Sequence, residues 1–299
     1  MQKPLLVVVC GPTGIGKTGI SIELAEHFQT CIVSADSRQF YREIPIGTAQ
    51  PSPGELERVP HFFIASHSIH EPVDAGTYAR EVHALLAREF EKRKIVFLTG
   101  GSGLFINAVI HGFDELPSQD AELRAALQQT VDENGLGPLL EELESTDPEY
   151  FALVDRQNPA RVIRAIEVCR LSGKKYSALC SQKERENFFR VVKLGLEMPR
   201  EKLYERINKR VDEMLEAGLE EEARRVFPFR HLNALQTVGY KELFDYFEGK
   251  TSREKAVELI RQHSRNYAKR QMTWWRKDAE IKWFEPGKIT EMMEMINEE

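Results

Sequence analysis

The chain has 299 residues, of which 41% are hydrophobic and 29% are charged. This composition excludes a disordered or fibrous protein, and the length allows two domains or one large domain with an insertion. The formal net charge of −6 argues against general affinity for nucleic acid. Charge is unevenly placed, however: residues 114–156 carry two basic and twelve acidic side chains, whereas residues 255–277 carry seven basic and one acidic. A local surface for an anionic partner is therefore compatible with the acidic total.

The apolar run at residues 5–10 is only six residues long, too short for a signal sequence or a membrane span. We therefore expect a cytoplasmic protein without a membrane partner. The four cysteines are widely scattered and form no C-x-x-C pair, which argues against a zinc site and a disulfide framework. We expect small buried apolar side chains at Cys10, Cys31, Cys169 and Cys180.

Residues 11–18 complete the pattern G-x-x-x-x-G-K-[ST] between an apolar, β-branched run and a helical pattern. Such a loop turns its backbone N–H groups toward a phosphate, while Lys17 supplies a positive charge and Thr18 a hydroxyl for Mg²⁺. The pattern predicts a phosphate-binding loop made of Gly11, Pro12, Thr13, Gly14, Ile15, Gly16, Lys17 and Thr18.

Short apolar strands alternate with amphipathic helices after this loop, which is typical of a parallel α/β sheet. Ligands of such sheets bind beyond the carboxyl ends of the strands, so we expect the loop, Asp36 and Ser102 to converge on one crevice. We expect strands at 31–34, 95–98 and 189–196 and helices at 78–92 and 104–110.

Residues 114–185 change character, because prolines and glycines separate short helical segments. Within them, Asn158 precedes Pro159 as an N-cap precedes the first helical residue, and Gly173 marks the end of that helix. Another helix should begin after Pro199. We predict an α/β fold: a P-loop NTPase-like parallel sheet core from residues 1–113 and 186–299, with a mainly helical insertion domain at 114–185.

A phosphate-binding loop does not specify a reaction. Many P-loop ATPases place an Asp after a second strand to hold Mg²⁺, but the strand at 95–98 ends in Thr-Gly-Gly. In the first hundred residues the strand-end acid is Asp36. From the residues alone, Asp36 is compatible with a metal ligand, a general base or a helix cap.

Eight blocks of the chain occur in the order seen in bacterial tRNA dimethylallyltransferases, a family that the chain resembles over nearly its whole length. The blocks are residues 11–18, 34–41, 46–51, 60–61, 100–105, 158–159 with Arg161 and Arg164, 236–241, and 268–275. Two residues depart from the family's pattern: Phe105 stands where Tyr is usual, and Phe62 where a second His is frequent. Any role for the lost hydroxyl and imidazole is therefore open.

The resemblance implies prenyl transfer from dimethylallyl diphosphate to the exocyclic amine of the adenine 3′ of the anticodon, with Mg²⁺ as cofactor. By similarity, Asp36 accepts the amine's proton, Ser102 supplies an orienting hydroxyl and Arg210 neutralises the leaving diphosphate. Taken alone, Arg210 also fits a solvated helix arginine. The implied partners are the tRNA anticodon stem-loop and dimethylallyl diphosphate, with the protein acting as a monomer.

The residues that face tRNA by similarity belong to five segments of the chain. They are Asp36, Ser37, Arg38, Gln39, Ser102, Arg124, Ala160, Arg161, Val162, Ile163, Arg164, Gln236, Thr237, Val238, Gly239, Tyr240 and Lys241. Lys269 and Arg270 add positive charge in the C-terminal run. Trp274 and Trp275 fit either base stacking or, as their helical spacing favours, the core.

Three other functions compete with this interpretation. A prenyltransferase acting on free AMP or ATP would share the phosphate loop and Asp36 but would need no surface for an anticodon loop. A small-molecule or nucleotide kinase would leave the later blocks unexplained. A non-catalytic P-loop module that binds RNA would not need both Asp36 and Ser102.

Overall fold

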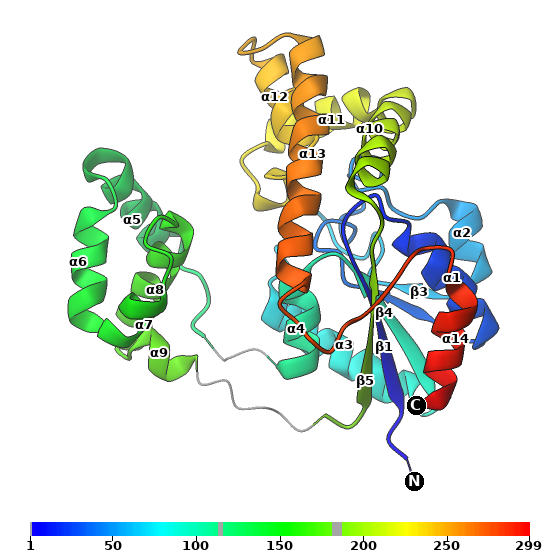
Figure 1. Cartoon of the computed structure of the whole chain (residues 1–299). Helices are drawn as coiled ribbons and strands as arrows, with labels where there is room; N and C mark the ends of the chain where they lie inside the picture. The colour runs from blue at the N-terminus through cyan, green and yellow to red at the C-terminus, as the bar shows by residue number, and fades with distance from the viewer. Residues whose placement is uncertain (1, 113–115, 181–186) are drawn as a thin grey trace. The chain divides into compact units, whose positions relative to one another are not determined.

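The computed structural model describes residues 2–112, 116–180 and 187–299 (Figure 1). The chain forms two compact units, one of Met1–Ile110 with Glu186–Glu299 and the other of His111–Arg185. The boundaries predicted from the sequence, 113/114 and 185/186, lie outside the described residues. Within the described ranges, no helix combines the length and the apolar character needed to cross a membrane.

The first unit is built on a six-stranded sheet in which every strand pair is parallel, as the sequence predicts. The strand order is β3-β2-β4-β1-β5-β6. The strands are β1 (Leu5–Cys10), β2 (Ile32–Ser34), β3 (His61–Phe62), β4 (Ile95–Gly100), β5 (Arg190–Leu196) and β6 (Lys282–Phe284). Because Cys10 pairs with Gly100, the loops after β1 and β4 leave the same edge of the sheet side by side.

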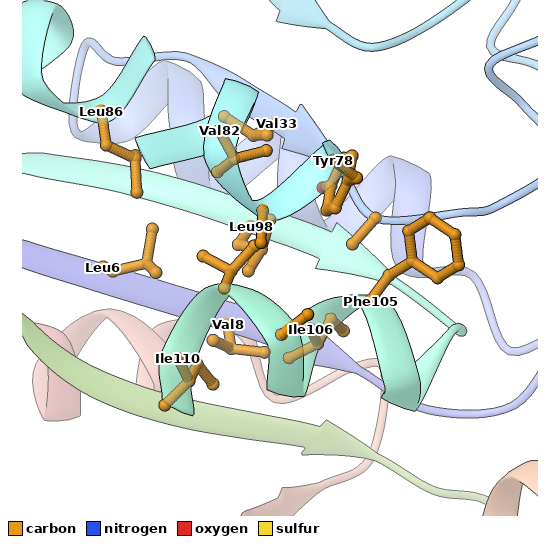
Figure 2. Close-up of a cluster of buried hydrophobic side chains, with 14 of the residues drawn as sticks. Leu6, Val8, Val33, Tyr78, Val82, Leu86, Leu98, Phe105, Ile106 and Ile110 are labelled. Carbon is orange, nitrogen blue, oxygen red and sulfur yellow. The ribbon is translucent and has the colours of Figure 1, made fainter. Parts of the chain in front are cut away.

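Apolar residues alternate between the two faces of the central strand, and both faces are covered. Leu6 and Val8 point toward α3 (Ala75–Glu89) and α4 (Gly103–His111), as Figure 2 shows. Residues of the opposite face pack with α1 (Lys17–His27) and α14 (Ile289–Glu298). The sheet therefore provides a rigid base for the loops at its carboxyl edge.

The helix predicted at 78–92 begins and ends three residues earlier than expected. Its actual start follows Asp74, whose carboxylate accepts a hydrogen bond from the Thr77 N–H at 2.8 Å. This N-cap satisfies a backbone donor that hydrophobic periodicity does not reveal.

Phe105, one of the two departures from the family pattern, is buried with its ring centroid 5.2 Å from that of Tyr78. Phe105 is thus a core residue (Figure 2).

Four helices pack together beyond the carboxyl edge of the sheet (Figure 1). They are α10 (Arg200–Glu216), α11 (Leu219–Val226), α12 (Tyr240–Phe247) and α13 (Arg253–Trp275). Gly218, with a φ of 98°, follows the end of α10 and allows the immediate turn into α11. Two short 3₁₀ turns, Phe227–Phe229 and Asn233–Leu235, and α2 (Pro53–Arg58) complete the elements of this unit.

The second unit is helical, and its own hydrophobic cluster includes Leu127, Leu143 and Ile166. Its helices are α5 (Ala121–Asn134), α6 (Gly137–Thr146), α7 (Pro148–Leu153), α8 (Pro159–Ser172) and α9 (Tyr176–Leu179). As predicted, the Asn158 side chain caps α8, and Gly173 ends it in a left-handed conformation with a φ of 66°. The start and end of this helix are set by neighbouring residues in the chain, which is why they could be predicted from the sequence.

The cysteine prediction is confirmed for two residues and wrong for two. Cys10 and Cys31 are buried, whereas Cys169 and Cys180 are only partly buried. Cys10 is buried because both faces of the sheet are covered, whereas Cys169 and Cys180 lie in the helical unit, which has a smaller core of its own. None of these four cysteines forms a disulfide.

Candidate active site

The loop after β1 encloses the Lys17 ammonium. Lys17 Nζ donates to the carbonyl oxygens of Gly11 at 3.1 Å and Pro12 at 2.9 Å, so it lies across the inside of the loop. Gly11 has a φ of 145°, and a Cβ there would lie 2.9 Å from the Leu196 carbonyl oxygen. Gly16, with a φ of 103°, precedes the first turn of α1. Backbone that only glycine adopts easily therefore shapes this cradle.

Electrostatics inside the loop favour an incoming anion. Burial lowers the pKa of Lys17 to about 8, and the nearby Arg210 charge lowers it further while Asp36 opposes the shift. A negatively charged ligand would restore the charged form that burial disfavours. The loop therefore has the properties of an anion site with two cations.

Arg210 reaches the same loop from α10. Its Nη1 donates to the Thr13 Oγ1 at 3.3 Å. Burial lowers the pKa of Arg210, and the Asp36 charge partly offsets this. Arg210 is half-buried beside the phosphate loop, so its placement differs from that of a solvated helix arginine.

Asp36 lies just beyond β2, half-buried at the mouth of the sheet edge. Its Oδ1 accepts a hydrogen bond from the Arg38 N–H at 3.0 Å and so closes a tight turn. No helix begins at this turn, so Asp36 is not a helix cap. The roles of base and metal ligand are both compatible with this position.

Ser102 joins the loop after β4 to the Asp36 segment. Its Oγ accepts from the Ser37 N–H at 3.2 Å and lies 3.2 Å from the Ser37 Oγ. Tyr267 of α13 hydrogen-bonds to Ser102, and burial and Asp36 raise the pKa of the Tyr267 phenol to about 12. Tyr267 is therefore a neutral phenol beside the Ser102 hydroxyl at physiological pH.

Asp36, Arg210 and Tyr267 line one cleft of about 780 Å³ within the first unit. Thr13 and Arg210 line it, together with many of the residues expected to face tRNA: Asp36, Ser37, Arg38, Gln236, Thr237, Val238, Gly239 and Lys241. Ser102, Gln39 and Tyr240 do not line it, so of the three groups expected to share one crevice the loop (through Thr13) and Asp36 do so, while Ser102 lies behind Ser37. The Gln39 amide donates to the Ala49 carbonyl at 2.9 Å, and Tyr240 is fully buried.

The expected RNA-facing residues of the second unit divide into exposed and buried groups. Ala160 and Arg161 are exposed at the start of α8, whereas Val162 and Ile163 lie in the unit's core. Arg164 Nη1 donates to the buried Glu167 at 2.8 Å, and Arg124 lies 3.9 Å from the same carboxylate.

The side chains near Thr18 show whether the protein could hold the expected Mg²⁺. Thr18 is the second residue of α1 and is half-buried. Over the described residues, no group of three or more His, Cys, Asp or Glu side chains could hold a metal. Mg²⁺ keeps several waters and often takes most other ligands from substrate phosphates. A single hydroxyl at the phosphate cradle fits that mode of binding.

Sequence reasoning assigned no role to Gln271, although the side chain connects two loops of the site. Gln271 shares one face of α13 with Ala268 and Trp275, and all three are buried. The sequence feature that could have revealed this role is an amide side chain on an otherwise apolar face of a helix.

The expectation that both tryptophans belong to the core is half wrong: Trp275 is 2% exposed and Trp274 42% exposed. Adjacent helix residues point about 100° apart, so one packs inward while its neighbour lies against Gly103.

The fold is that of an α/β protein of the P-loop type, and its strand-end carboxylate, Asp36, interacts electrostatically with the two cations Lys17 and Arg210. The chain matches the IPP transferase family model over residues 39–278. It is 47% identical over 293 residues to tRNA dimethylallyltransferase 1 of Bacteroides thetaiotaomicron, covering 98% of this chain and 95% of that protein. The chain belongs to the IPP transferase family and is a prenyl-transferring enzyme.

Solved structures agree with this assignment. A full-length tRNA isopentenylpyrophosphate transferase from Bacillus halodurans is 36% identical, with a TM-score of 0.73 and coverage of 99% of this chain and 96% of that one. A eukaryotic dimethylallyltransferase acting on tRNA has a TM-score of 0.79, with coverage of 94% and 74%. At 24% identity, the latter shows a shared fold.

Proposed function

We propose that this enzyme transfers a dimethylallyl group from dimethylallyl diphosphate to the exocyclic amine of the adenine 3′ of the anticodon in tRNA. The observation that carries the proposal is the common cleft of Asp36, Thr13 and Arg210, where an acceptor's proton and a leaving diphosphate would each meet a partner. The names of the relatives favour tRNA over free AMP or ATP as acceptor.

On the donor side, the proposal assigns the diphosphate to residues 11–18. The carbon–oxygen bond of the donor breaks and its electron pair leaves with the diphosphate. Lys17, the loop amides and Arg210 would stabilise that developing charge, and such preorganised stabilisation often dominates catalysis. Mg²⁺, held at Thr18 and by phosphate and water oxygens, would supply further charge neutralisation.

On the acceptor side, the amine nitrogen forms the new carbon–nitrogen bond and loses a proton. Adenine's amine is a poor nucleophile because its lone pair is delocalised into the ring. Asp36 would accept the proton, a contribution of about 10²–10⁴-fold for a well-placed base. Ser102, linked to both Ser37 and Tyr267, would orient the amine.

The target base must leave the stacked anticodon loop to reach such a cleft, which costs a few kcal/mol that contacts elsewhere offset. We assign those contacts to residues 36–39 and 236–241 of the first unit, where buried Tyr240 would act through the segment it anchors, and to Arg124 and residues 160–164 of the second. Exposed Ala160 and Arg161 would touch RNA directly, whereas Val162 and Ile163 would act through the backbone they support. The proposal further takes the enzyme to be a cytoplasmic monomer.

The test uses labelled dimethylallyl diphosphate with Mg²⁺ and an anticodon stem-loop that carries adenine 3′ of the anticodon. Label should enter this RNA and not the same stem-loop with guanine at that position, nor AMP. Asp36→Asn should bind the stem-loop normally and transfer about 10²-fold more slowly. Asp132→Asn, at an exposed position of α5, is the matched control. Label in AMP at an equal rate, or none in the adenine stem-loop, would overturn the proposal.

A further inference from the structure

Gln271 of α13 bridges the two glycine-containing loops that follow β1 and β4. Its Oε1 accepts a hydrogen bond from the Thr13 N–H at 2.8 Å, and its Nε2 donates to the Gly101 carbonyl oxygen at 3.0 Å. The side chain is buried, with 7% of its surface exposed. Two loops that leave neighbouring strands are therefore connected by one amide from a helix far away in the sequence.

The bridge requires an amide, because one end must accept and the other must donate. A carboxylate would accept from Thr13 but would face the Gly101 carbonyl with a second negative oxygen. A methionine has nearly the same shape but makes neither bond, which leaves a buried N–H and a buried C=O unsatisfied. The fit is also tight, since a Cβ on Gly101 would overlap the Gln271 Nε2.

Thr13 links this bridge to the chemistry. Its N–H is held by Gln271, and its Oγ1 accepts from Arg210, the cation assigned to the leaving diphosphate. On the other side, Gly101 precedes Ser102, whose hydroxyl contacts the Asp36 segment. One side chain thus connects the loop that Arg210 contacts with the loop that carries Ser102.

We propose that Gln271 is a positioning residue for prenyl transfer, which fixes the loop at Thr13 relative to the loop at Gly101 and Ser102. The inference rests on the proposed function. Gln271 contacts neither substrate; it acts through Thr13 on Arg210 and through Gly101 on Ser102. Because α13 also carries Arg270 and Tyr267 on the cleft, the same amide connects this wall of the cleft with the phosphate loop.

The experiment compares Gln271→Met and Gln271→Glu with Gln262→Met, an exposed glutamine on the same helix that undergoes the same change. The assay is the stem-loop transfer described above, with kcat and KM measured separately and folding checked by thermal unfolding. Gln271→Met should lower kcat about 10–100-fold with KM for the stem-loop within about threefold, because misplacement by about 1 Å costs on the order of 10²-fold. Gln262→Met should match the unchanged chain.

Gln271→Glu adds a pH test that a merely structural role would not pass. A buried carboxyl beside a carbonyl oxygen has a raised pKa, and its protonated form can again accept from Thr13 and donate to Gly101. Activity relative to the unchanged chain should therefore rise at least fivefold from pH 8.5 to pH 6, whereas the ratio for Gln271→Met should stay flat. If Gln271→Met unfolds, this profile alone decides.

The outcomes separate the two proposals. If the unchanged chain transfers label but Gln271→Met keeps its kcat, the positioning role is overturned and the proposed function stands. A flat pH profile for folded Gln271→Glu has the same consequence. If the unchanged chain transfers no label, the proposed function fails and this inference fails with it.

Discussion

The Tyr240 hydroxyl donates to the Glu222 carboxylate over 2.5 Å inside the cluster formed by α10–α13. Glu222 is fully buried and also accepts from the N–H groups of Ile46 at 2.9 Å and Gly47 at 2.8 Å. Burial and the Glu222 charge raise the pKa of the Tyr240 phenol well above its usual value. A buried carboxylate thus anchors the Ile46–Gly47 turn, and with it Gly47 in the wall of the cleft.

Removing either partner should destabilise the protein unequally. Tyr240→Phe deletes one charge-assisted hydrogen bond and should lower the free energy of unfolding by about 1.5–3 kcal/mol. Glu222→Gln should cost more, because its amide NH₂ would oppose a backbone N–H that the carboxylate accepts. Urea unfolding measures both, with exposed Glu221→Gln as the control, which should stay within about 0.5 kcal/mol. Equal, small effects in all three would show that the buried network contributes nothing.

The lowered pKa of Lys17 predicts how donor binding depends on pH. The pKa is about 8 in the free protein, so Lys17 is charged at pH 7 and largely neutral at pH 9.5. Affinity for dimethylallyl diphosphate should therefore fall as pH rises above about 8, by roughly tenfold or more at pH 9.5. Cys10 nearby does not interfere, because burial raises the pKa of its thiol to about 12.

Titration calorimetry across pH 7–9.5 checks this dependence, with Lys17→Gln as the comparison. The glutamine variant should bind more weakly at pH 7 and show no fall between pH 8 and pH 9.5. A parallel decline in both proteins would assign the titration to another group, and unchanged affinity at pH 7 would remove the diphosphate from this loop.

Ser102 provides a test of hydroxyl chemistry. Ser102→Ala removes the group that meets Ser37 and Tyr267, so kcat should drop about tenfold or more while the fold is retained. Ser102→Thr keeps the hydroxyl and should hold activity within about threefold. Steady-state kinetics on the stem-loop compare the three proteins. Equal rates for the serine and alanine proteins would mean that the Ser102 hydroxyl has no role in the reaction.

The sequence predicted the parts of this fold that depend on local signals. The loop at residues 11–18 follows from its glycine spacing. The strand at Leu5–Cys10 and the predicted 95–98 part of β4 follow from unbroken apolar runs, whereas β4 runs on through Thr99 to Gly100. Asp36 could be placed near the loop because the carboxyl ends of parallel strands share one edge. The start of α3 was missed because a side-chain cap, not the apolar period, sets it.

Contacts between distant segments could not be predicted in the same way. Gln271 and Thr13 are 258 positions apart, and Glu222 and Gly47 are 175 apart. In the sequence, Gln271 and Glu222 look like ordinary polar residues of a helix. Only the packing of α10–α13 over the sheet edge gives each of them its partner. Tyr240 was assigned to RNA by similarity of its segment, but its side chain points into the protein. Buried polar groups must find partners, and the fold determines which.

The charge asymmetry leads to the last prediction. Lys269 and Arg270 are exposed on α13, and Arg270 lines the cleft with its guanidinium 5.7 Å from the centre of the Tyr267 ring. If they contact RNA phosphates, replacing both by Gln should weaken stem-loop binding and flatten the log–log salt slope by about one to two units. Affinity for dimethylallyl diphosphate should not change, because the donor is assigned to the Lys17 loop.

The control is the double variant Lys92→Gln with Lys94→Gln, which loses the same amount of charge. These two lysines precede β4, at the opposite end of that strand from Gly100. Binding measured across a salt series should separate the two pairs. An identical slope for both would mean that Lys269 and Arg270 are solvated, and the phosphate contacts would then belong to Arg161 and the helical unit.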